Sequence, residues 1–526
     1  MNDGPARSGL PPATGVVLRF VLERNAGERP DEPCVLFDDG SVWSRSDALR
    51  HAYSAGNALR AAGVEAGRRV AVFLPNGADF CRAWFGLAAI GASIVPVNTA
   101  FRGDTLAHLL DLAGAPLVVT DETLGARLDE LDPPVRRLLP GELHGPVDPP
   151  PVPDGLGPWS EASVILTSGT TGPSKASITS WHQLYLTGAW ATVDLGLDEA
   201  DTFLIDLPLF HQAAASMTLG ALAARSRIAV RRAPALDDYW ATAKEAGATM
   251  AFLLSSMVPY LTARPPGPAD TDHGLRYMIA APFPADPAGF CARFGLTDLV
   301  TAFGSTEVSG CLVRRPGDPL VPGSVGRIRP GYEVRLVDEH DVEVPAGEPG
   351  ELVIRTDLPW CLSSGYLRDP EGSAAAWRNG WFHTGDVLRT DGKGNYFFHD
   401  RRKDCLRRRG ENISSFDVER SVTAHPAVGE AACVAVRSDL GVDDDVKVWI
   451  VPAGDTEVDF AELVAYLAER LPHFMVPRYY ELVDGLPKTP SMRVQKHVLR
   501  ERGNSERTWD RQVAGLRVTR DGLVRR

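Results

Sequence analysis

The chain has 526 residues, of which 44% are hydrophobic and 23% are charged, a composition typical of a globular protein with more than one domain. The formal net charge of −13 argues against a nucleic-acid binder, because phosphate contacts need a basic surface. Seven scattered cysteines without a Cys-x-x-Cys pair argue against a disulfide framework or zinc site, and a cytoplasmic location is expected.

The N-terminal half predicts alternating helices and strands. Ser44, with Asp47 three residues later, is typical of a helix N-cap, and Gly63 is typical of a helix end. Apolar strands and the helices between them are expected at 69–74, 78–90, 93–97, 102–113 and 116–120. This alternation predicts a parallel sheet. The uncharged stretch 83–101 is interrupted by glycines and a proline, so no membrane span is expected.

After a Pro-rich connection at 133–158, the alternation resumes and continues to residue 281, and short β segments from about residue 320 predict a β-rich appendage. The composition changes again near Arg401, where a small α/β unit begins. The expected fold class is α/β, with a large N-terminal domain of parallel and mixed sheets, a small mobile C-terminal domain and an Arg-rich mobile tail. These parts are expected at 1–400, 401–503 and 504–526.

An apolar strand at 164–166 runs into a loop of hydroxyls and glycines that ends at Lys175. Glycines let the backbone approach a ligand closely, and successive N–H groups and hydroxyls offer donors to anionic oxygens. The loop therefore predicts phosphate binding, although its spacing is not that of a Walker A loop. An ordinary Ser/Thr/Gly surface loop is the alternative.

Four further motifs carry candidate chemistry. In 301–307, Phe303 can stack on a base, Thr306 can contact phosphate and Glu307 can bind Mg²⁺, although a plain turn has the same composition. Asp386 follows a turn and can accept two ribose hydroxyls, or it can simply cap that turn. The basic runs at 400–412 and 486–496 are, taken alone, most simply solvated surface.

Together these motifs, in this order between about residues 35 and 500, resemble the adenylate-forming superfamily of acyl-CoA synthetases, firefly luciferase and peptide-synthetase adenylation domains. The amino-acid sequences of the segments 208–211, 303–307 and 408–419 are most similar to those of the carnitine/crotonobetaine-CoA ligase group. The resemblance implies a two-step reaction. A carboxylate attacks the α-phosphate of Mg·ATP to give an acyl-adenylate and pyrophosphate, and the CoA thiol then displaces AMP.

The resemblance also implies roles for individual residues. Lys403 marks the hinge about which the small domain rotates between the two steps, and Glu307 binds Mg²⁺. The residues expected to act in catalysis are Thr170, His211, Glu307, Arg493 and Lys496. Adenylate contacts are expected from Thr167, Ser168, Gly169, Thr170, Thr171, Gly172, Lys175, Ala281, Pro282, Phe303, Gly304, Ser305, Thr306, Asp386 and Arg401. CoA contacts are expected from Arg407, Arg408, Arg409, Gly410 and Glu411.

One position departs from the family pattern. The family's late loop ends in Gly-Lys, and its lysine bridges the substrate carboxylate and the adenylate, whereas this chain has Met492 and Arg493 there. Because a guanidinium is planar and longer than an ammonium, one hypothesis is that adenylation is impaired while thioester formation from a preformed adenylate persists. A separate adenylating enzyme would then be a partner. The alternatives are a fully competent ligase, with Lys488 or Lys496 substituting, and a non-catalytic adenylate-binding protein.

The acid is expected to be bulky and hydrophobic. In this family the pocket wall comes largely from segments matching His211, 212–217, 252–260 and 303–310, which here are rich in small and apolar side chains. No carboxylate that would anchor a quaternary amine is apparent, which argues against carnitine itself as the acid. The expected ligands are thus CoA, ATP or an acyl-adenylate, Mg²⁺ and a small carboxylic acid; the oligomeric state is left open, a dimer being one option.

Overall fold

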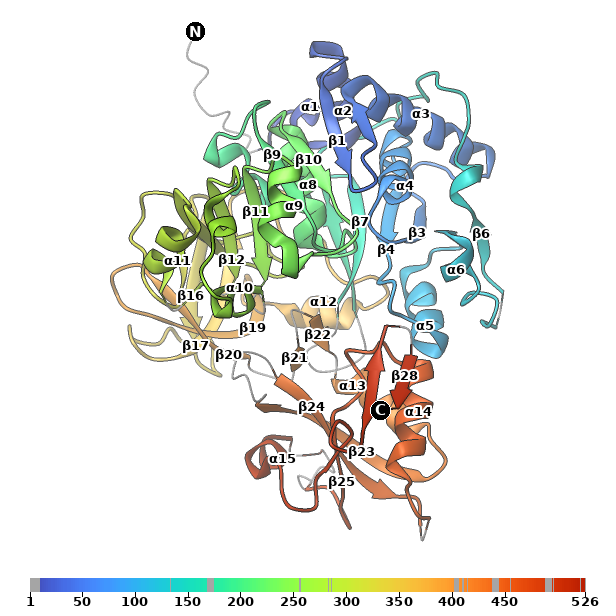
Figure 1. Cartoon of the computed structure of the whole chain (residues 1–526), viewed down its shortest axis with the longest axis vertical. Helices are drawn as coiled ribbons and strands as arrows, with labels where there is room; N and C mark the ends of the chain where they lie inside the picture. Colours follow the sequence, from blue (N-terminus) through green and yellow to red (C-terminus); the bar gives the residue numbers. More distant parts are fainter. Residues whose placement is uncertain are drawn as a thin grey trace.

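The computed structural model describes residues 10–525 except for 133, 168–174, 255–256, 282, 285, 402–405, 409–410, 414, 438–443, 455, 488–493, 495 and 521. A large domain precedes residue 402, and a small domain follows it and lies below it in Figure 1. Within the described residues, no helix is both long and apolar enough to cross a bilayer.

A mostly parallel sheet carries the phosphate-loop candidate. Its strand order is β6-β5-β3-β4-β7-β8, with β8 antiparallel to β7. These strands are β3 (Arg69–Phe73), β4 (Ser93–Pro96), β5 (Leu117–Thr120), β6 (Arg136–Leu138), β7 (Glu161–Thr167) and β8 (Lys175–Ser180). Thus β7 leads into the loop and β8 leads out of it, which fixes both ends of the loop at one sheet edge.

A longer sheet changes from parallel to antiparallel along its width. Its order is β16-β17-β19-β20-β15-β14-β13-β12-β11-β9-β10-β1-β2, and β18 pairs with β19. The parallel strands are β1 (Pro33–Phe37), β9 (Thr202–Ile205), β10 (Arg227–Val230), β11 (Met250–Leu254), β12 (Tyr277–Ala281) and β13 (Asp298–Phe303). The antiparallel strands are β2 (Val42–Ser44), β14 (Leu312–Arg314), β15 (Ser324–Ile328), β16 (Tyr332–Val337), β17 (Gly350–Thr356), β18 (Trp377–Arg378), β19 (Trp381–Thr390) and β20 (Tyr396–Arg401). The expected β-rich appendage is therefore a continuation of this sheet.

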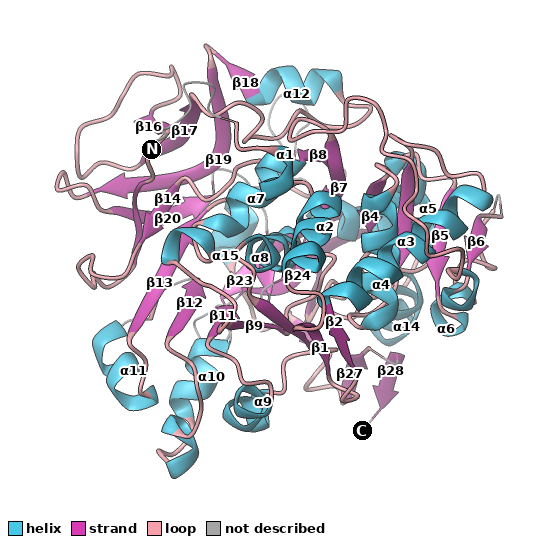
Figure 2. Ribbon diagram, turned by 90° about the horizontal axis from the view of Figure 1, so that it is seen from above, coloured by secondary structure: helices cyan, strands magenta, loops and turns pink. Residues whose placement is uncertain are grey.

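The main core lies between the two sheets, where helices pack against both (Figure 2). The central helices are α1 (Ala13–Val16), α2 (Leu18–Glu28), α3 (Arg45–Ala61), α4 (Ala78–Ala89), α7 (Trp181–Ala189) and α8 (Gln212–Ala223). The outer helices are α5 (Gly103–Ala113), α6 (Glu122–Gly125), α9 (Tyr239–Glu245), α10 (Met257–Ala263), α11 (Pro287–Phe294) and α12 (Pro370–Ala376). Ser44 caps α3 as predicted, since its hydroxyl accepts the Asp47 N–H while the Asp47 carboxylate accepts the Ser44 N–H.

The small domain begins with a two-stranded hairpin and contains its own hydrophobic core. Its sheet has the order β23-β24-β25-β26. The elements are β21 (Leu406–Arg408), β22 (Glu411–Ile413), α13 (Ser415–Thr423), β23 (Val428–Arg437), β24 (Asp444–Pro452), α14 (Phe460–Arg470), β25 (Tyr479–Leu482), α15 (Lys496–Arg502), β26 (Trp509–Asp510), β27 (Leu516–Thr519) and β28 (Gly522–Arg525). This α/β arrangement confirms the expected fold class.

The structure corrects the expectation of a mobile tail. Strand β26 pairs with β25, and β27 and β28 form a hairpin. Leu516 and Val518 are buried in the core of the small domain. The guanidinium of Arg102, in the large domain, donates to the carbonyl of Arg520 at 2.8 Å. The arginines dominate the composition of this segment, but its spaced apolar residues decide where it packs.

Candidate active site

A tight turn at the end of β13 holds Glu307. The backbone N–H groups of Ser305 and Val308 each donate to the other residue's carbonyl, at 3.1 and 3.2 Å. A Cβ on Gly304 would lie 2.9 Å from the carbonyl oxygen of Val308, so the turn has no room for a side chain there. The Ser305 hydroxyl donates to Oε2 of Glu307 at 2.8 Å. The turn therefore orients the carboxylate through its own residues.

Tyr366 links Glu307 to the lysine that closes the phosphate-loop candidate. Its hydroxyl donates to Oε1 of Glu307 at 3.0 Å, and Nζ of Lys175 lies 4.1 Å from its ring centroid. Burial, together with the charge of Glu307, raises the pKa of Tyr366 well above its usual value. The phenol is therefore protonated and acts as a donor. The sequence interpretation missed Tyr366, although an aromatic residue within a Ser/Gly-rich stretch was a usable signal.

The segment 363–367 is attached to both motifs through its backbone. The N–H of Ser363 donates to the Glu307 carbonyl at 2.8 Å, and the N–H of Leu367 donates to the Ala176 carbonyl at 2.8 Å. The hydroxyls of Ser177 and Ser363 are 2.9 Å apart. The segment thus runs beside β8 and brings the end of the phosphate loop next to the β13 turn, two motifs that are far apart in the sequence.

The ribose candidates face each other across two strands. Asp386 of β19 and Arg401 of β20 are register partners, and Asp386 is buried. The N–H of Asp386 donates to the Thr384 hydroxyl at 3.1 Å, which fixes the backbone before the carboxylate. Only the backbone of Arg401 is described. Strand pairing alone therefore brings together the two residues expected to hold the ribose.

The aromatic candidate for base stacking, Phe303 of β13, lies next to an aromatic residue of β20. The rings of Phe303 and Phe398 have centroids 6.5 Å apart at an interplanar angle of 27°. Ala281 ends β12, the strand next to β13. Phe398 is 46% exposed, so one aromatic face in this region is open to a ligand.

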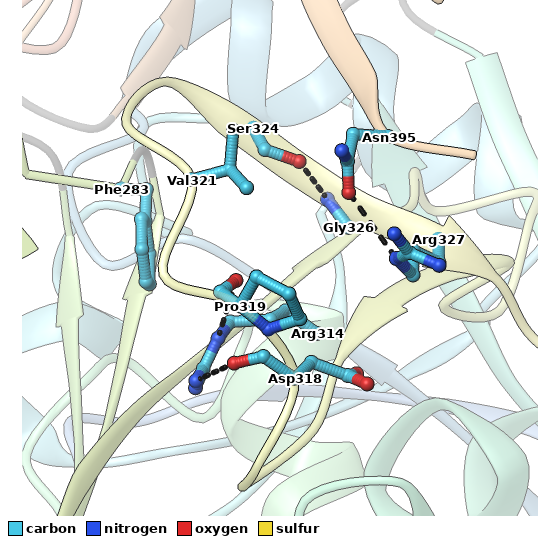
Figure 3. A pocket seen from close by; sticks show the side chains of 9 residues that line it. All are labelled: Phe283, Arg314, Asp318, Pro319, Val321, Ser324, Gly326, Arg327 and Asn395. Carbon is cyan, nitrogen blue, oxygen red and sulfur yellow. Dashed lines mark hydrogen bonds between the residues drawn. The ribbon is translucent and has the colours of Figure 1, made fainter. Parts of the chain in front are cut away.

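A small cavity lies near the adenine candidates (Figure 3). Its volume is about 10 Å³, and Phe283, Arg314 and Asn395 are among its lining residues. Arg314 is held by Asp298 at 2.8 Å and by the carbonyl of Pro319 at 3.4 Å. A cavity of this size holds about one water molecule, so it cannot hold a nucleotide base.

His211 lies at the start of α8, near the carboxyl end of β9. Its ring centroid is 4.7 Å from that of Phe210, and its backbone N–H donates to the Pro208 carbonyl at 3.0 Å. Helix α8 packs closely against α7, because a Cβ on Gly188 of α7 would overlap the backbone carbonyl oxygen of Ser216. The backbone of the segment 212–217 therefore lies directly against α7 at Gly188.

Two cations expected to act in the site, Arg408 and Lys496, are paired with carboxylates of the small domain itself. Arg408, expected at CoA, is 5% exposed and lies 3.2 Å from Asp445, with carbonyls of Phe474 and Val476 at 3.2 and 3.3 Å. Lys496 lies 2.6 Å from Glu419 and donates to the Ser415 hydroxyl at 2.8 Å. These contacts fit structural roles for both residues in this arrangement of the domains.

The remaining candidates are described in part or not at all. Those outside the described residues are Ser168, Gly169, Thr170, Thr171, Gly172, Pro282, Lys403, Arg409, Gly410, Lys488 and Arg493. For Thr167, Arg407 and Glu411 only the backbone is described. The hairpin β21–β22, which carries the CoA candidates, lies at the end of the small domain that faces the large domain (Figure 1).

The polar groups of the site are compatible with Mg²⁺ bound together with a nucleotide. No group of three or more His, Cys, Asp or Glu side chains suited to a metal occurs among the described residues. Mg²⁺ usually binds through one or two carboxylates plus substrate phosphates and water. Glu307, oriented by two hydroxyl donors, fits such a site.

Comparison with known proteins gives the family. Residues 22–367 match the AMP-binding enzymes, and residues 417–493 match the C-terminal domain of AMP-binding enzymes. The chain belongs to the AMP-binding enzyme family. The predicted membership of the adenylate-forming superfamily of acyl-CoA ligases is thereby confirmed.

Three relatives illustrate the likeness. The crotonobetaine/carnitine–CoA ligase of Salmonella choleraesuis is 28% identical over 92% of this chain and 99% of its own length. The amide bond synthetase McbA of Marinactinospora thermotolerans is 26% identical, with a TM-score of 0.77 over 91% and 99% of the two chains. The o-succinylbenzoate CoA synthetase of Bacillus subtilis, as a double mutant bound to a product analogue, is 22% identical, with a TM-score of 0.80 over 92% and 98%.

Proposed function

We propose that this AMP-binding enzyme forms the CoA thioester of a bulky hydrophobic carboxylic acid through an acyl-adenylate, and that its adenylation step is weakened by Arg493. The observation that carries the ligase assignment is the match of both parts of the chain to AMP-binding enzymes, together with the likeness to crotonobetaine/carnitine–CoA ligases over 92% of the chain. Its membership of the family supplies the two-step chemistry.

In the first step, a carboxylate oxygen attacks the α-phosphorus of ATP and pyrophosphate leaves. Charge accumulates on the phosphoryl oxygens, so donors and cations fixed in advance lower the barrier. Lys175 supplies a cation at the end of the phosphate loop, and Glu307 would hold Mg²⁺. Mg²⁺ neutralises phosphate charge when it is bound. Asp386 and Arg401 would hold the ribose.

In the second step, the CoA sulfur attacks the acyl carbon, the C–O bond to AMP breaks, and the thiol proton is lost. This step needs no cation at position 493, because the acid is already activated. Arg493 keeps the charge of the expected lysine, but its planar head cannot present a compact ammonium to a crowded phosphorus. We therefore assign the weaker rate to the first step. A separate adenylating enzyme would then supply the acyl-adenylate.

An experiment with two starting points tests this proposal. In one set of reactions the purified protein receives acid, ATP and CoA, and in the other it receives synthetic acyl-adenylate and CoA. Both sets cover a panel of aromatic, long-chain and short acids. The thioester product is quantified by mass spectrometry. The proposal predicts thioester mainly from the adenylates of bulky hydrophobic acids. Equal yields from both sets would show a fully competent ligase, and no thioester from either set would favour a non-catalytic adenylate-binding protein.

The variant Arg493→Lys tests whether the shape of this side chain slows adenylation. It should raise pyrophosphate release from acid and ATP at least about tenfold, which corresponds to about 1.4 kcal/mol in the barrier. Arg502→Lys, at an exposed position of α15, is the matched control and should change nothing. An unchanged rate in Arg493→Lys would show that the shape of this cation is not the defect.

Amide formation is the second candidate function. McbA, an amide bond synthetase, is 26% identical to this chain over almost its full length. An amine would then replace the CoA thiol as the nucleophile toward the same adenylate. Adding a panel of amines to the adenylate reactions distinguishes the two functions, because amide formed in preference to thioester would favour this candidate.

A further inference from the structure

Tyr366 stands at the junction of two motifs that the reaction must use together. Its neighbours Ser363 and Leu367 are hydrogen-bonded through their backbone N–H groups to Glu307 and Ala176, so the segment that carries Tyr366 is fixed at both ends. The residue also forms a bridge with Ser177 of β8. The backbone of Tyr366 is therefore held between β8 and the turn that carries Glu307.

The hydroxyl of Tyr366 acts on the carboxylate of Glu307. It donates to Oε1 while Ser305 donates to Oε2, so each oxygen is held by one donor. A carboxylate has about four lone-pair positions, so both oxygens keep acceptor capacity for a cation. Donors of this kind fix the orientation of a metal ligand, and their removal typically weakens metal affinity by about 10–100-fold.

The ring of Tyr366 acts on Lys175. The ammonium lies 4.1 Å from the ring centroid, which is a cation–π contact. The face of an aromatic ring attracts an ammonium electrostatically. One side chain thus contacts both the lysine at the end of the phosphate loop and the carboxylate expected to bind the metal.

We propose that Tyr366 is a positioning residue for nucleotide binding, whose hydroxyl orients Glu307 toward the metal and whose ring seats Lys175 toward the phosphates. This inference rests on the proposed function, because it assumes that Glu307 and Lys175 meet Mg·ATP. It assigns separate tasks to two parts of one side chain, and these can be removed one at a time. Tyr366→Phe removes only the hydroxyl, and Tyr366→Leu removes the ring as well.

The test measures nucleotide binding by calorimetry, without acid or CoA, once with Mn²⁺·ATP and once with ATP in EDTA. Tyr366→Phe should weaken Mn²⁺·ATP binding about tenfold and leave metal-free ATP within about twofold of wild type. Tyr366→Leu should weaken both. Tyr53→Phe is the control, because Tyr53 also donates to a glutamate, Glu23, at 2.8 Å, away from this site, and its loss should leave both affinities unchanged.

The outcomes separate this inference from the function on which it rests. If wild type binds Mn²⁺·ATP and Tyr366→Phe binds it equally well, the positioning role of the hydroxyl is wrong. If Tyr366→Phe weakens both forms of ATP equally, the division of tasks is wrong. If wild type binds neither form, this inference is wrong, whereas the proposed function fails only if synthetic acyl-adenylate and CoA also give no thioester. Circular dichroism and thermal unfolding of each variant show whether a loss reflects misfolding.

Discussion

Glu307 and Asp386 reach the candidate site by different routes. Glu307 sits in a turn and depends on two hydroxyl donors, one from its own turn and one from Tyr366, which lies 59 positions later in the chain. Asp386 sits on a strand and is placed by register with Arg401. The motifs predicted both carboxylates, but local sequence patterns cannot pair two residues so far apart, so the hydrogen bond between Tyr366 and Glu307 emerged only from the structure.

Asp206 allows a test of pH dependence at a single residue. It follows β9 and is 2% exposed, and burial, opposed by backbone hydrogen bonds and by Arg231, raises its pKa to about 7 from 3.8. Between about pH 4 and 7 the folded protein keeps a proton that the unfolded chain has lost. This carboxyl therefore lowers the stability of the fold as the pH rises through that range.

We expect Asp206→Asn to raise the melting temperature relative to wild type more at pH 7 than at pH 4. The melting temperature of the variant minus that of wild type should increase from pH 4 to pH 7 by about a few degrees, because asparagine does not ionise. Differential scanning calorimetry at both values gives this difference. A difference that stays constant with pH would show that Asp206 does not hold a proton in the folded state. Asp31→Asn, at an exposed position, is the control.

Helices α7 and α8 show how small residues can serve packing. Gly188 and Gly220 allow the two helices to approach, because a Cβ on Gly220 would lie 3.0 Å from the backbone carbon of Gly188 and a Cβ on Gly188 would overlap the Ser216 carbonyl. Protein interiors are close-packed, so such an overlap must move one helix. The sequence shows that these residues are small, but it does not show whether the space beside them holds a ligand or a helix.

This packing predicts opposite results for two glycine substitutions. Gly188→Ala should destabilise the protein by about 1–3 kcal/mol through overpacking. Gly27→Ala, in α2, meets nothing within 4 Å and should be neutral or stabilise by up to about 1 kcal/mol, because alanine favours a helix. Urea unfolding followed by fluorescence compares the two. Equal effects would show that α7 and α8 are not in close contact.

The C-terminal hairpin of β27 and β28 packs on the small domain and also contacts the large domain. Leu516 and Val518 pack in the small-domain core, and Arg102 donates to the Arg520 carbonyl. Ending the chain after Gly515 should lower the melting temperature of the small domain and speed its proteolysis, because apolar core surface becomes exposed. Arg520→Ala keeps the carbonyl acceptor and should behave as wild type. A truncated protein as stable as wild type would show that the hairpin contributes no stability.

At the scale of the whole molecule, periodicity predicted the α/β class and the motifs predicted the family, and both are confirmed, whereas the domain boundaries and the roles of the site residues stay predictions. The sequence pattern did not predict how the strands pair. The structure shows that the long sheet continues in antiparallel strands, which joins the appendage to the site, and that β8 places Lys175 beside Tyr366. The tail was misjudged because charge dominated its composition, whereas a few apolar residues determine its packing.

The most direct test compares the two half-reactions in one preparation of wild-type protein. ATP–pyrophosphate exchange, with acid but without CoA, reports adenylation alone, and thioester formation from synthetic acyl-adenylate and CoA reports the second step alone. We predict a second-step rate at least about a hundredfold above the exchange rate, which corresponds to about 2.7 kcal/mol between the two barriers. An exchange rate equal to or above the thioester rate would contradict the account.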